Sequence, residues 1–224
     1  GWVTESVENY DRVCARMAQA TAHIVVSVEY RLAPEHTFPT AHDDAERGAI
    51  LVWQYANTLG VDKNRITLCG DSAGGHLALV TALRLKAKGL WQPAQLILIY
   101  PMLDATASFE SYTLNGTDYI ITRDTLLSGY EMYLAETDRQ HPEASPLWRD
   151  DFYGLPPVHI ITAEYDPLCD EGEMLYQHLT EQGVKCTAQR WLGVIHGFFQ
   201  LGGVSQSARD VMRDIAWRIS SARQ

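Results

Sequence analysis

Runs of β-branched and aliphatic residues recur along this chain and alternate with segments of helical periodicity. The four clearest apolar runs cover residues 23–30, 65–69, 95–100 and 158–165, and a weaker fifth covers 186–191. Near-continuous apolar runs of this length indicate strands that are buried on both faces, as in a parallel sheet. Such a sheet needs helices on both faces, which restricts the chain to the α/β class.

The segments between these runs carry the helical pattern that this class requires. Amphipathic helices are predicted over residues 7–20, 41–58, 72–88, 170–182 and 205–221. Gly60, Gly89 and Gly183 follow three of them closely, where a glycine commonly ends a helix. Strand-helix alternation of this kind predicts a mostly parallel sheet flanked by helices.

Residues 104–157 break the alternation. They contain no convincing strand, one predicted helix over 122–135, and many residues that are typical of loops. We interpret the segment as a helical cap inserted over the strand ends, where ligands bind in open α/β sheets. The alternative is a solvated excursion without a role in the site.

Composition narrows the class of partner. The 224 residues suffice for a single domain, and the net charge of −10 argues against nucleic acid or an anionic membrane as partner. No run approaches the 18 apolar residues of a membrane span.

The four cysteines form no metal-binding pattern, which favours free thiols. Free thiols and the lack of a signal-like segment together favour a cytoplasmic location. The oligomeric state is not determined, and a homodimer is one state that the sequence allows.

The pentapeptide Gly-Asp-Ser-Ala-Gly at residues 70–74 matches the pattern G-x-S-x-G. It follows a predicted strand and opens a predicted helix, which is the context of a nucleophile elbow. Small residues are needed there because the turn is tight, and the new helix aims its first N–H groups at a developing oxyanion. The pattern predicts that Ser72 is a nucleophile, and the alternative is an inert serine in a glycine-rich turn.

A serine nucleophile needs a base, and an imidazole base needs an acid to orient it. In this fold the chain order is serine, acid, histidine. His196 occupies a loop between the last predicted strand and the last helix, whereas His159 lies within a strand and His178 within a helix. Asp166 ends the 158–165 strand and is the predicted acid, with Asp104 as its competitor.

Six blocks of the sequence together resemble the bacterial hormone-sensitive-lipase-like carboxylesterases of the α/β-hydrolase fold. They are YRLAPEHTFP at 30–39, GDSAGG at 70–75, ASPL at 144–147, GLPP at 154–157, DPLCDEG at 166–172 and IHGF at 195–198. The resemblance implies Ser72, Asp166 and His196 as the catalytic triad and the Ala73 N–H as an oxyanion donor. It also implies hydrolysis of short-chain acyl esters through an acyl-enzyme, without metal or cofactor. His76 departs from the family, which usually has asparagine there.

The first residues resemble the end of the family's glycine-rich oxyanion loop. Gly1 and Trp2 match the last glycine of that loop and its aromatic neighbour, so Gly1 is a second candidate oxyanion residue. We therefore expect this chain to be a fragment whose parent is roughly 80 residues longer. Loss of one oxyanion donor costs about 2.7–4 kcal/mol of transition-state stabilisation, so we expect the fragment to be slow or unfolded.

The sequence leaves two other functions open. A non-catalytic relative could bind a small molecule in the same fold, although family members of that kind have lost the catalytic histidine that His196 represents here. An amidase or deacetylase could use the same three residues, and the sequence does not separate amide from ester hydrolysis.

Overall fold

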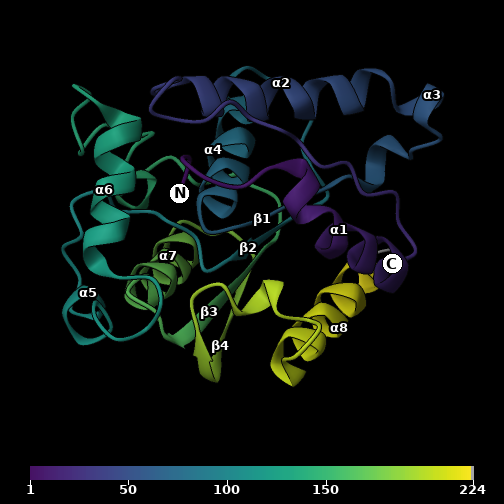
Figure 1. Cartoon of the computed structure of the whole chain (residues 1–224). Coiled ribbons are helices and arrows are strands. Elements are labelled where there is room, and N and C mark those ends of the chain that lie inside the picture. The colour runs from purple at the N-terminus through teal and green to yellow at the C-terminus, as the bar shows by residue number, and fades with distance from the viewer. Residues whose placement is uncertain (223–224) are drawn as a thin grey trace.

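The centre of the protein is a four-stranded parallel sheet. The computed structural model describes residues 1–222, and its sheet runs in the order β1-β2-β3-β4 (Figure 1). The strands are β1 (Thr67–Asp71), β2 (Gln95–Ile99), β3 (Val158–Tyr165) and β4 (Cys186–Ile195). Each pairs in parallel with the next. Residues that follow the strands therefore emerge at one edge of the sheet.

Eight α-helices among residues 1–222 surround or cap this sheet, and most begin and end within two residues of their predicted bounds. They are α1 (Val7–Thr21), α2 (Thr40–Gln54), α3 (Ala56–Leu59), α4 (Ala73–Ala87), α5 (Ser111–Leu114), α6 (Arg123–Leu134), α7 (Cys169–Glu181) and α8 (Gln206–Ser221). The predicted helix over 41–58 is interrupted at Tyr55, which separates α2 from α3. Short α5 was not predicted, because four residues are too few to show a helical period.

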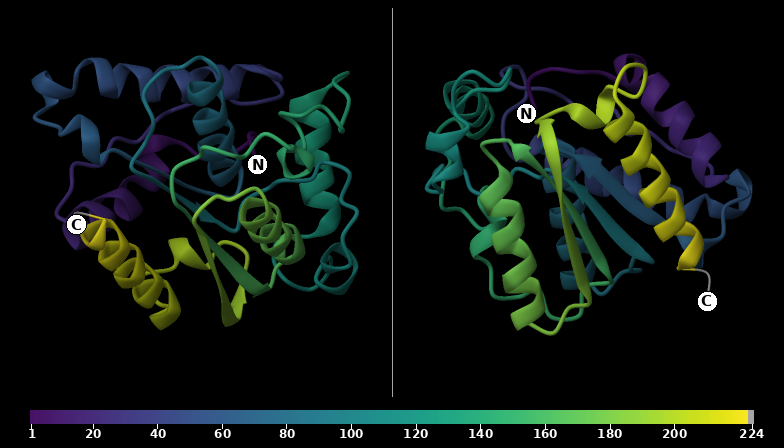
Figure 2. Two further views of the ribbon diagram at one scale, coloured as in Figure 1. Left: turned by 180° about the vertical axis from the view of Figure 1, so that it is seen from behind. Right: turned by 90° about the horizontal axis from the view of Figure 1, so that it is seen from below.

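The alternating side chains of β2 divide the core into two layers. Leu96 and Leu98 pack with α4 and α7 on one face of the sheet. Ile97 and Ile99 pack with α1 and α8 on the opposite face. Figure 2 shows α7 and α8 on opposite sides of the strands. The predicted α/β architecture is therefore confirmed.

The prediction of a strand over residues 23–30 was wrong. These residues form no strand, and among residues 1–222 β1 pairs with β2 alone. A groove of about 950 Å³, lined by both segments, runs between residues 23–30 and β1. Apolar β-branched residues form a strand only where a neighbour completes the backbone hydrogen bonds. Without that neighbour Ile24 remains 60% exposed.

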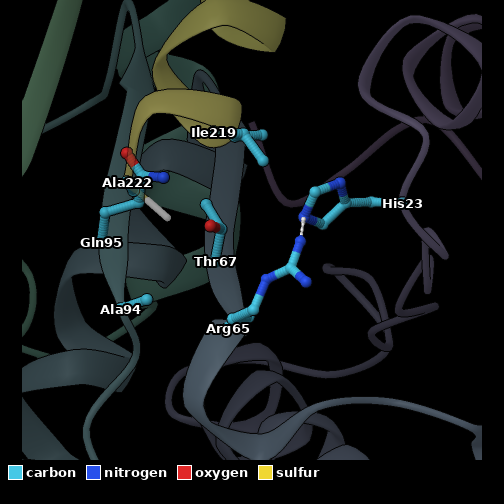
Figure 3. Close-up of a pocket in the computed structure, with 7 residues that line it drawn as sticks. All are labelled: His23, Arg65, Thr67, Ala94, Gln95, Ile219 and Ala222. Carbon is cyan, nitrogen blue, oxygen red and sulfur yellow. Dashed lines mark hydrogen bonds between the residues drawn. The ribbon is translucent and has the colours of Figure 1, made fainter. Parts of the chain in front are cut away.

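A single contact joins the two sides of this groove near the amino end of β1. The Arg65 Nη2 lies 3.4 Å from the His23 Nε2, and the two side chains face each other in Figure 3. The cavity beside them holds only about 10 Å³, which is the space of one water molecule. This cavity is too small for an organic ligand.

Residues 104–157 connect β2 to β3 and contain α5 and α6 but no strand. Their apolar side chains form a third cluster, in which Tyr112, Tyr130 and Tyr133 are almost completely buried. Trp2 belongs to the same cluster and stacks on Tyr133 with ring centroids 4.8 Å apart. The start of the chain is thus packed against α6, as Figure 1 shows.

Two further observations concern membrane-spanning helices and the cysteines. None of the helices within residues 1–222 combines the length and the apolarity that a bilayer crossing requires. All four cysteines carry free thiols.

The two-layer core predicts different costs for two leucines in strands. Leu98 of β2 is completely buried, whereas Leu192 of β4 is 70% exposed. We expect Leu98→Ala to lower the free energy of unfolding by about 2–5 kcal/mol, because it leaves a cavity between α4 and the sheet. The matched Leu192→Ala should change it by less than about 1 kcal/mol. Urea unfolding followed by circular dichroism measures both, and equal losses would contradict this description of the core.

Candidate active site

Ser72 lies in a strained turn between β1 and α4. Its φ of 56° and ψ of −118° are unfavourable for a residue with a side chain. The Ser72 N–H donates to the carbonyl oxygen of Ile99 at 2.9 Å, which ties the turn to the end of β2. This backbone places the serine beyond the sheet edge, as the G-x-S-x-G pattern predicted.

Two glycines make this turn sterically feasible. A Cβ on Gly70 would lie 2.2 Å from the carbonyl carbon and oxygen of Gly74, and one on Gly75 would lie 2.9 Å from the Pro101 Cβ. Real Cβ atoms do not approach other atoms so closely, so the first turn of α4 can fold back on β1 only without these side chains. The sequence prediction that small residues are required here is consistent with these distances.

His196 follows β4 and lies between Ser72 and Asp166. Its Nε2 is 3.0 Å from the Ser72 Oγ, and its Nδ1 is 2.8 Å from the Asp166 Oδ2. The His196 side chain is 7% exposed and that of Asp166 is completely buried. Gly197 has a φ of 88°, which turns the chain directly after the imidazole. Three residues that are far apart in sequence thus form one chain of hydrogen bonds.

Asp166 is held from two sides. Its Oδ1 accepts the Leu168 N–H at 2.9 Å, while its Oδ2 faces His196. Asn115, which ends α5, donates through its Nδ2 to the carbonyl oxygens of Glu164 and Asp166, both at 3.2 Å. A carboxylate fixed in this way keeps its partner imidazole in one orientation and one tautomer.

The competitor Asp104 is engaged elsewhere. Its carboxylate accepts hydrogen bonds from the backbone and hydroxyl groups of Thr106 and Ser108. Burial acts to raise the pKa of Asp104, but these hydrogen bonds outweigh it and hold the pKa below its usual value. His159 and His178 are also occupied, through Thr187 and the Leu147 carbonyl. The structure therefore brings Asp166, rather than Asp104, to His196.

The candidate oxyanion residues lie beside the serine. Ala73 is the first residue of α4 and is almost completely buried, and its N–H has no acceptor within the helix. Gly1 lines the same cavity as Ser72 and Ala73. The positive end of the α4 dipole thus lies at the turn that carries Ser72.

Comparison with known proteins agrees with this geometry. The family profile described as alpha/beta hydrolase fold matches residues 1–200. The chain belongs to the hormone-sensitive-lipase-like family of α/β-hydrolases.

Several relatives of the chain are named as esterases. It is 35% identical over 210 residues to an ethyl acetate hydrolase of Pseudomonas putida, which covers 93% of this chain and 66% of that protein. An arylesterase of Saccharolobus solfataricus is 34% identical over 94% of this chain and 68% of its own length. The chain thus spans about two thirds of the length of these relatives.

Solved structures of esterases superpose closely. A hyperthermophilic esterase from the archaeon Pyrobaculum calidifontis gives a TM-score of 0.95 at 41% identity, over 98% of this chain and 73% of that one. A thermostable carboxylesterase cloned from a metagenomic library gives 0.96 at 36% identity, over 100% and 77%.

Sequence reasoning missed a set of polar residues around the elbow. Asp71, which precedes Ser72, accepts hydrogen bonds from the hydroxyls of Tyr10 and Tyr100. The Tyr100 ring also lies 4.5 Å, centroid to centroid, from the His196 ring. These contacts join residues at least 29 positions apart, so no local pattern could have indicated them.

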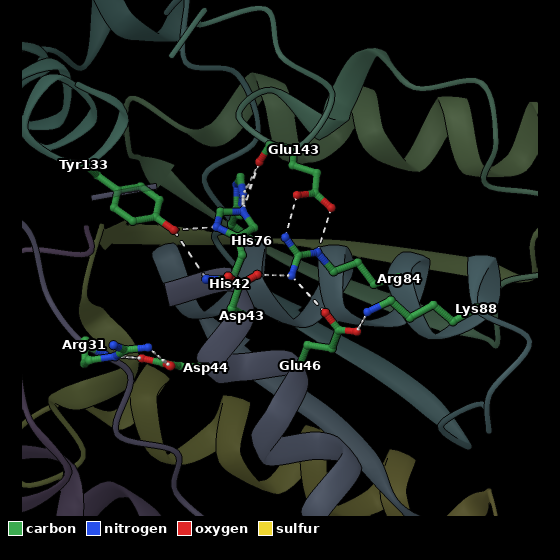
Figure 4. A network of polar contacts seen from close by, with 10 residues as sticks. All are labelled: Arg31, His42, Asp43, Asp44, Glu46, His76, Arg84, Lys88, Tyr133 and Glu143. Atoms are coloured by element: carbon green, nitrogen blue, oxygen red, sulfur yellow. Dashed lines mark hydrogen bonds and ion pairs between the residues drawn. The ribbon is translucent and has the colours of Figure 1, made fainter. Parts of the chain in front are cut away.

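A second polar group that the sequence did not reveal lies between α2, α4, α6 and the loop that carries Glu143. Figure 4 shows His42 and His76 side by side, with Tyr133 and Glu143 around them. Arg84 anchors the same region through a bidentate ion pair with Glu143 at 2.7 Å. The unusual histidine at position 76 was the one sequence signal that pointed here.

The Gly70 contact yields a direct test of the turn. Gly70→Ala places a methyl group against the Gly74 backbone, so we expect it to displace α4 from β1. Loss of about 3 kcal/mol or more in the free energy of unfolding, measured in urea, is the expected result. Gly60→Ala is the comparison at a site with open space, where the positive φ alone should cost about 1 kcal/mol. A Gly70→Ala variant as stable as the parent would contradict the close approach.

Burial of His76 predicts a pH dependence of stability. Burial lowers its pKa to about 4 from the ordinary 6.5. Between these pH values the unfolded chain binds a proton at this residue and the folded protein does not. The free energy of unfolding should therefore fall by about 2–3 kcal/mol from this residue as pH drops from 6.5 to 4. His76→Asn should flatten that slope in urea unfolding, and an unchanged slope would show that His76 does not remain neutral when folded.

Proposed function

We propose that this chain carries the catalytic machinery of a serine carboxylesterase that hydrolyses short-chain acyl esters. The observation that supports this most strongly is the hydrogen-bonded series from the Ser72 Oγ through His196 to Asp166, at 3.0 and 2.8 Å. Ser72 is the nucleophile, His196 the base and Asp166 the orienting acid. No metal or cofactor takes part in the proposed reaction.

The proposed first step is acyl transfer to the serine. The Ser72 Oγ attacks the ester carbonyl carbon while its proton moves to the His196 Nε2. The Asp166 carboxylate accepts the His196 Nδ1–H and stabilises the imidazolium that forms. The negative charge on the former carbonyl oxygen is stabilised by the Ala73 N–H at the start of α4, with Gly1 as the second candidate donor.

The same residues complete the cycle. The imidazolium of His196 gives its proton to the departing alkoxide, and the alcohol leaves the acyl-enzyme. Water then attacks the acyl carbon while His196 removes its proton. The imidazolium gives this proton to the Ser72 Oγ as the bond between the acyl carbon and the serine oxygen breaks, and the free acid leaves. Each proton taken by His196 is returned, so the reaction consumes only the ester and water.

One feature supports a short acyl group in the substrate, and a second supports an apolar one. The relative from Pseudomonas putida is named an ethyl acetate hydrolase. We also propose that residues 104–157 act as a cap near the site, because Asn115 contacts Asp166 and the side chains of Ile120 and Ile121 line the cavity that contains Ser72. Alkyl side chains in that position favour an apolar acyl or alcohol group.

Replacement of the nucleophile tests the proposal. Ser72→Ala should lower kcat for p-nitrophenyl butyrate by at least about a thousandfold, because within residues 1–222 no other hydroxyl is hydrogen-bonded to His196. Ser221→Ala, at an exposed serine that ends α8, is the control and should leave kcat unchanged. The assay is run on this chain and on the longest natural chain that contains it. Stoichiometric labelling of Ser72 by an organophosphate is the second readout.

The acid is tested by a matched pair of variants. Asp166→Asn should lower kcat by about 10³–10⁴-fold, since an amide holds the imidazole in the wrong tautomer. Asp104→Asn should change kcat little, because its partners are Thr106 and Ser108. The reverse order of effects would transfer the role to Asp104.

The alternatives predict other outcomes of the same assays. A non-catalytic binding protein would fold, hydrolyse no ester and resist the organophosphate. An amidase or deacetylase would lose amide hydrolysis with Ser72→Ala and prefer amides to esters in a substrate panel. The cytoplasmic location and the homodimer remain predictions.

A further inference from the structure

Two buried histidines lie directly behind the nucleophile turn. His42 of α2 and His76 of α4 are 2% and 0% exposed, and their Nε2 atoms are 2.8 Å apart. The rings meet edge to face, with centroids 4.9 Å apart. Neither residue belongs to the series of Ser72, His196 and Asp166.

The outer nitrogens assign the direction of the hydrogen bonds. The His76 Nδ1 is 2.8 Å from the Met102 carbonyl oxygen, which can only accept, so this nitrogen carries the proton. A neutral His76 then accepts at Nε2 from the His42 Nε2–H. The His42 Nδ1 accepts from the Tyr133 hydroxyl at 2.6 Å. Hydrogen bonds thus run in one direction, from Tyr133 through His42 and His76 to Met102.

Met102 transmits this series to the nucleophile. The backbone N–H of Met102 donates to the Ser72 carbonyl oxygen at 3.2 Å, and the backbone N–H of His76 donates to the same oxygen at 3.2 Å. His76 therefore holds the Ser72 carbonyl oxygen in two ways. Its backbone N–H bonds this oxygen directly, and its imidazole bonds the carbonyl of Met102, whose N–H bonds the same oxygen. Ser72 has strained dihedral angles, which persist only where several contacts fix them.

The other end of the series reaches the candidate oxyanion loop and the proposed cap. Tyr133 is part of α6, and Trp2 stacks on its ring. Trp2 also meets the His76 ring edge to face, with centroids 5.0 Å apart. The histidine pair thus contacts the residue next to Gly1 as well as the turn that carries Ser72.

We propose that His42 and His76 are positioning residues, which hold the Ser72 turn and the Gly1–Trp2 segment in register for acyl transfer. The inference rests on the proposed esterase function. It concerns residues that touch no substrate and act through Met102, Tyr133 and Trp2.

The charged and titratable groups around the pair are consistent with two neutral imidazoles. Burial lowers the pKa of His42 well below its ordinary value, and the neighbouring His76 and the Arg84 guanidinium lower it further. The other groups that face the region are Glu143 and His141 from the 135–145 loop, Tyr133 from α6, and Asp43 and Glu46 from α2. Arg84 pairs with all three of those carboxylates.

The Glu143 backbone also contributes. Its carbonyl oxygen lies 3.0 Å from the His42 Nε2 and 2.9 Å from the His76 Nε2. With the His76 proton on Nδ1, the His76 Nε2 cannot donate to this carbonyl oxygen, so only the His42 Nε2–H can. This single N–H is therefore shared between the His76 Nε2 and the Glu143 carbonyl oxygen. Removal of either ring leaves a buried polar atom without its partner, so the two histidines should act as one unit.

The test compares His42→Asn, His76→Asn and the double variant in p-nitrophenyl butyrate hydrolysis. Asparagine has a shorter side chain than histidine, so we expect His76→Asn to lose at least one of the contacts to Met102 and His42. We expect each single variant to lower kcat about 10- to 100-fold with KM within threefold, as for a displaced catalytic group. The double variant should lose no more than the worse single variant. His178→Asn, which removes a contact to the Leu147 carbonyl, is the matched control and should retain full activity.

Three outcomes overturn the proposal. They are a wild-type kcat in His76→Asn, effects of the two single variants that multiply in the double variant, or an equal loss in His178→Asn. A kcat loss matched by loss of folded protein would also count against it, and circular dichroism of each variant reports this.

A crystal structure of the His76→Asn variant judges the inference independently of activity. The hydrogen bond from the Met102 N–H to the Ser72 carbonyl is expected to lengthen beyond 3.5 Å or the Ser72 φ to shift. An unchanged turn would refute the positioning role even if the esterase proposal holds. A wild-type protein that neither hydrolyses esters nor reacts with an organophosphate would refute the esterase proposal, whatever the turn does.

Discussion

The conformation of Ser72 is the constraint on which the rest of the site depends. A residue with a side chain adopts this combination of φ and ψ only at a cost of order 1–3 kcal/mol, so its surroundings must enforce it. Here the enforcement comes from β2 through the Ile99 carbonyl, from the absence of a side chain at Gly70, and from the two N–H groups on the Ser72 carbonyl. The sheet and α4 together therefore impose the conformation of this turn.

Parallel strand order then brings the remaining groups to the serine. Asp166 follows β3 and His196 follows β4, and both strands end at the edge where β1 delivers Ser72. The segment between β2 and β3 contains α5 and α6 and leaves the strand order unchanged. The candidate catalytic side chains thus lie directly after strands of the sheet, while the proposed cap belongs to a connecting segment.

Sequence patterns predicted the parts that depend on local rules. The elbow and the main helices follow from glycine spacing, apolar runs and helical periodicity, whereas the candidate acid and base depend on the chain order known for this fold. The structure places His196 within hydrogen-bond distance of both Ser72 and Asp166. The strand over 23–30 failed because strand formation depends on a partner, which local composition does not reveal. The His42–His76 contact could not be predicted, since its partners are 34 residues apart and Tyr133 is a further 57 positions along the chain.

The groove beside β1 has a mechanical consequence. Backbone groups on that edge of β1 lack a strand neighbour among residues 1–222, and such edges readily accept an extended segment by strand addition. A strand in the groove would hydrogen-bond the residues immediately before Ser72 and restrict their motion. A strand bound along this edge would therefore stiffen the segment that carries the nucleophile turn.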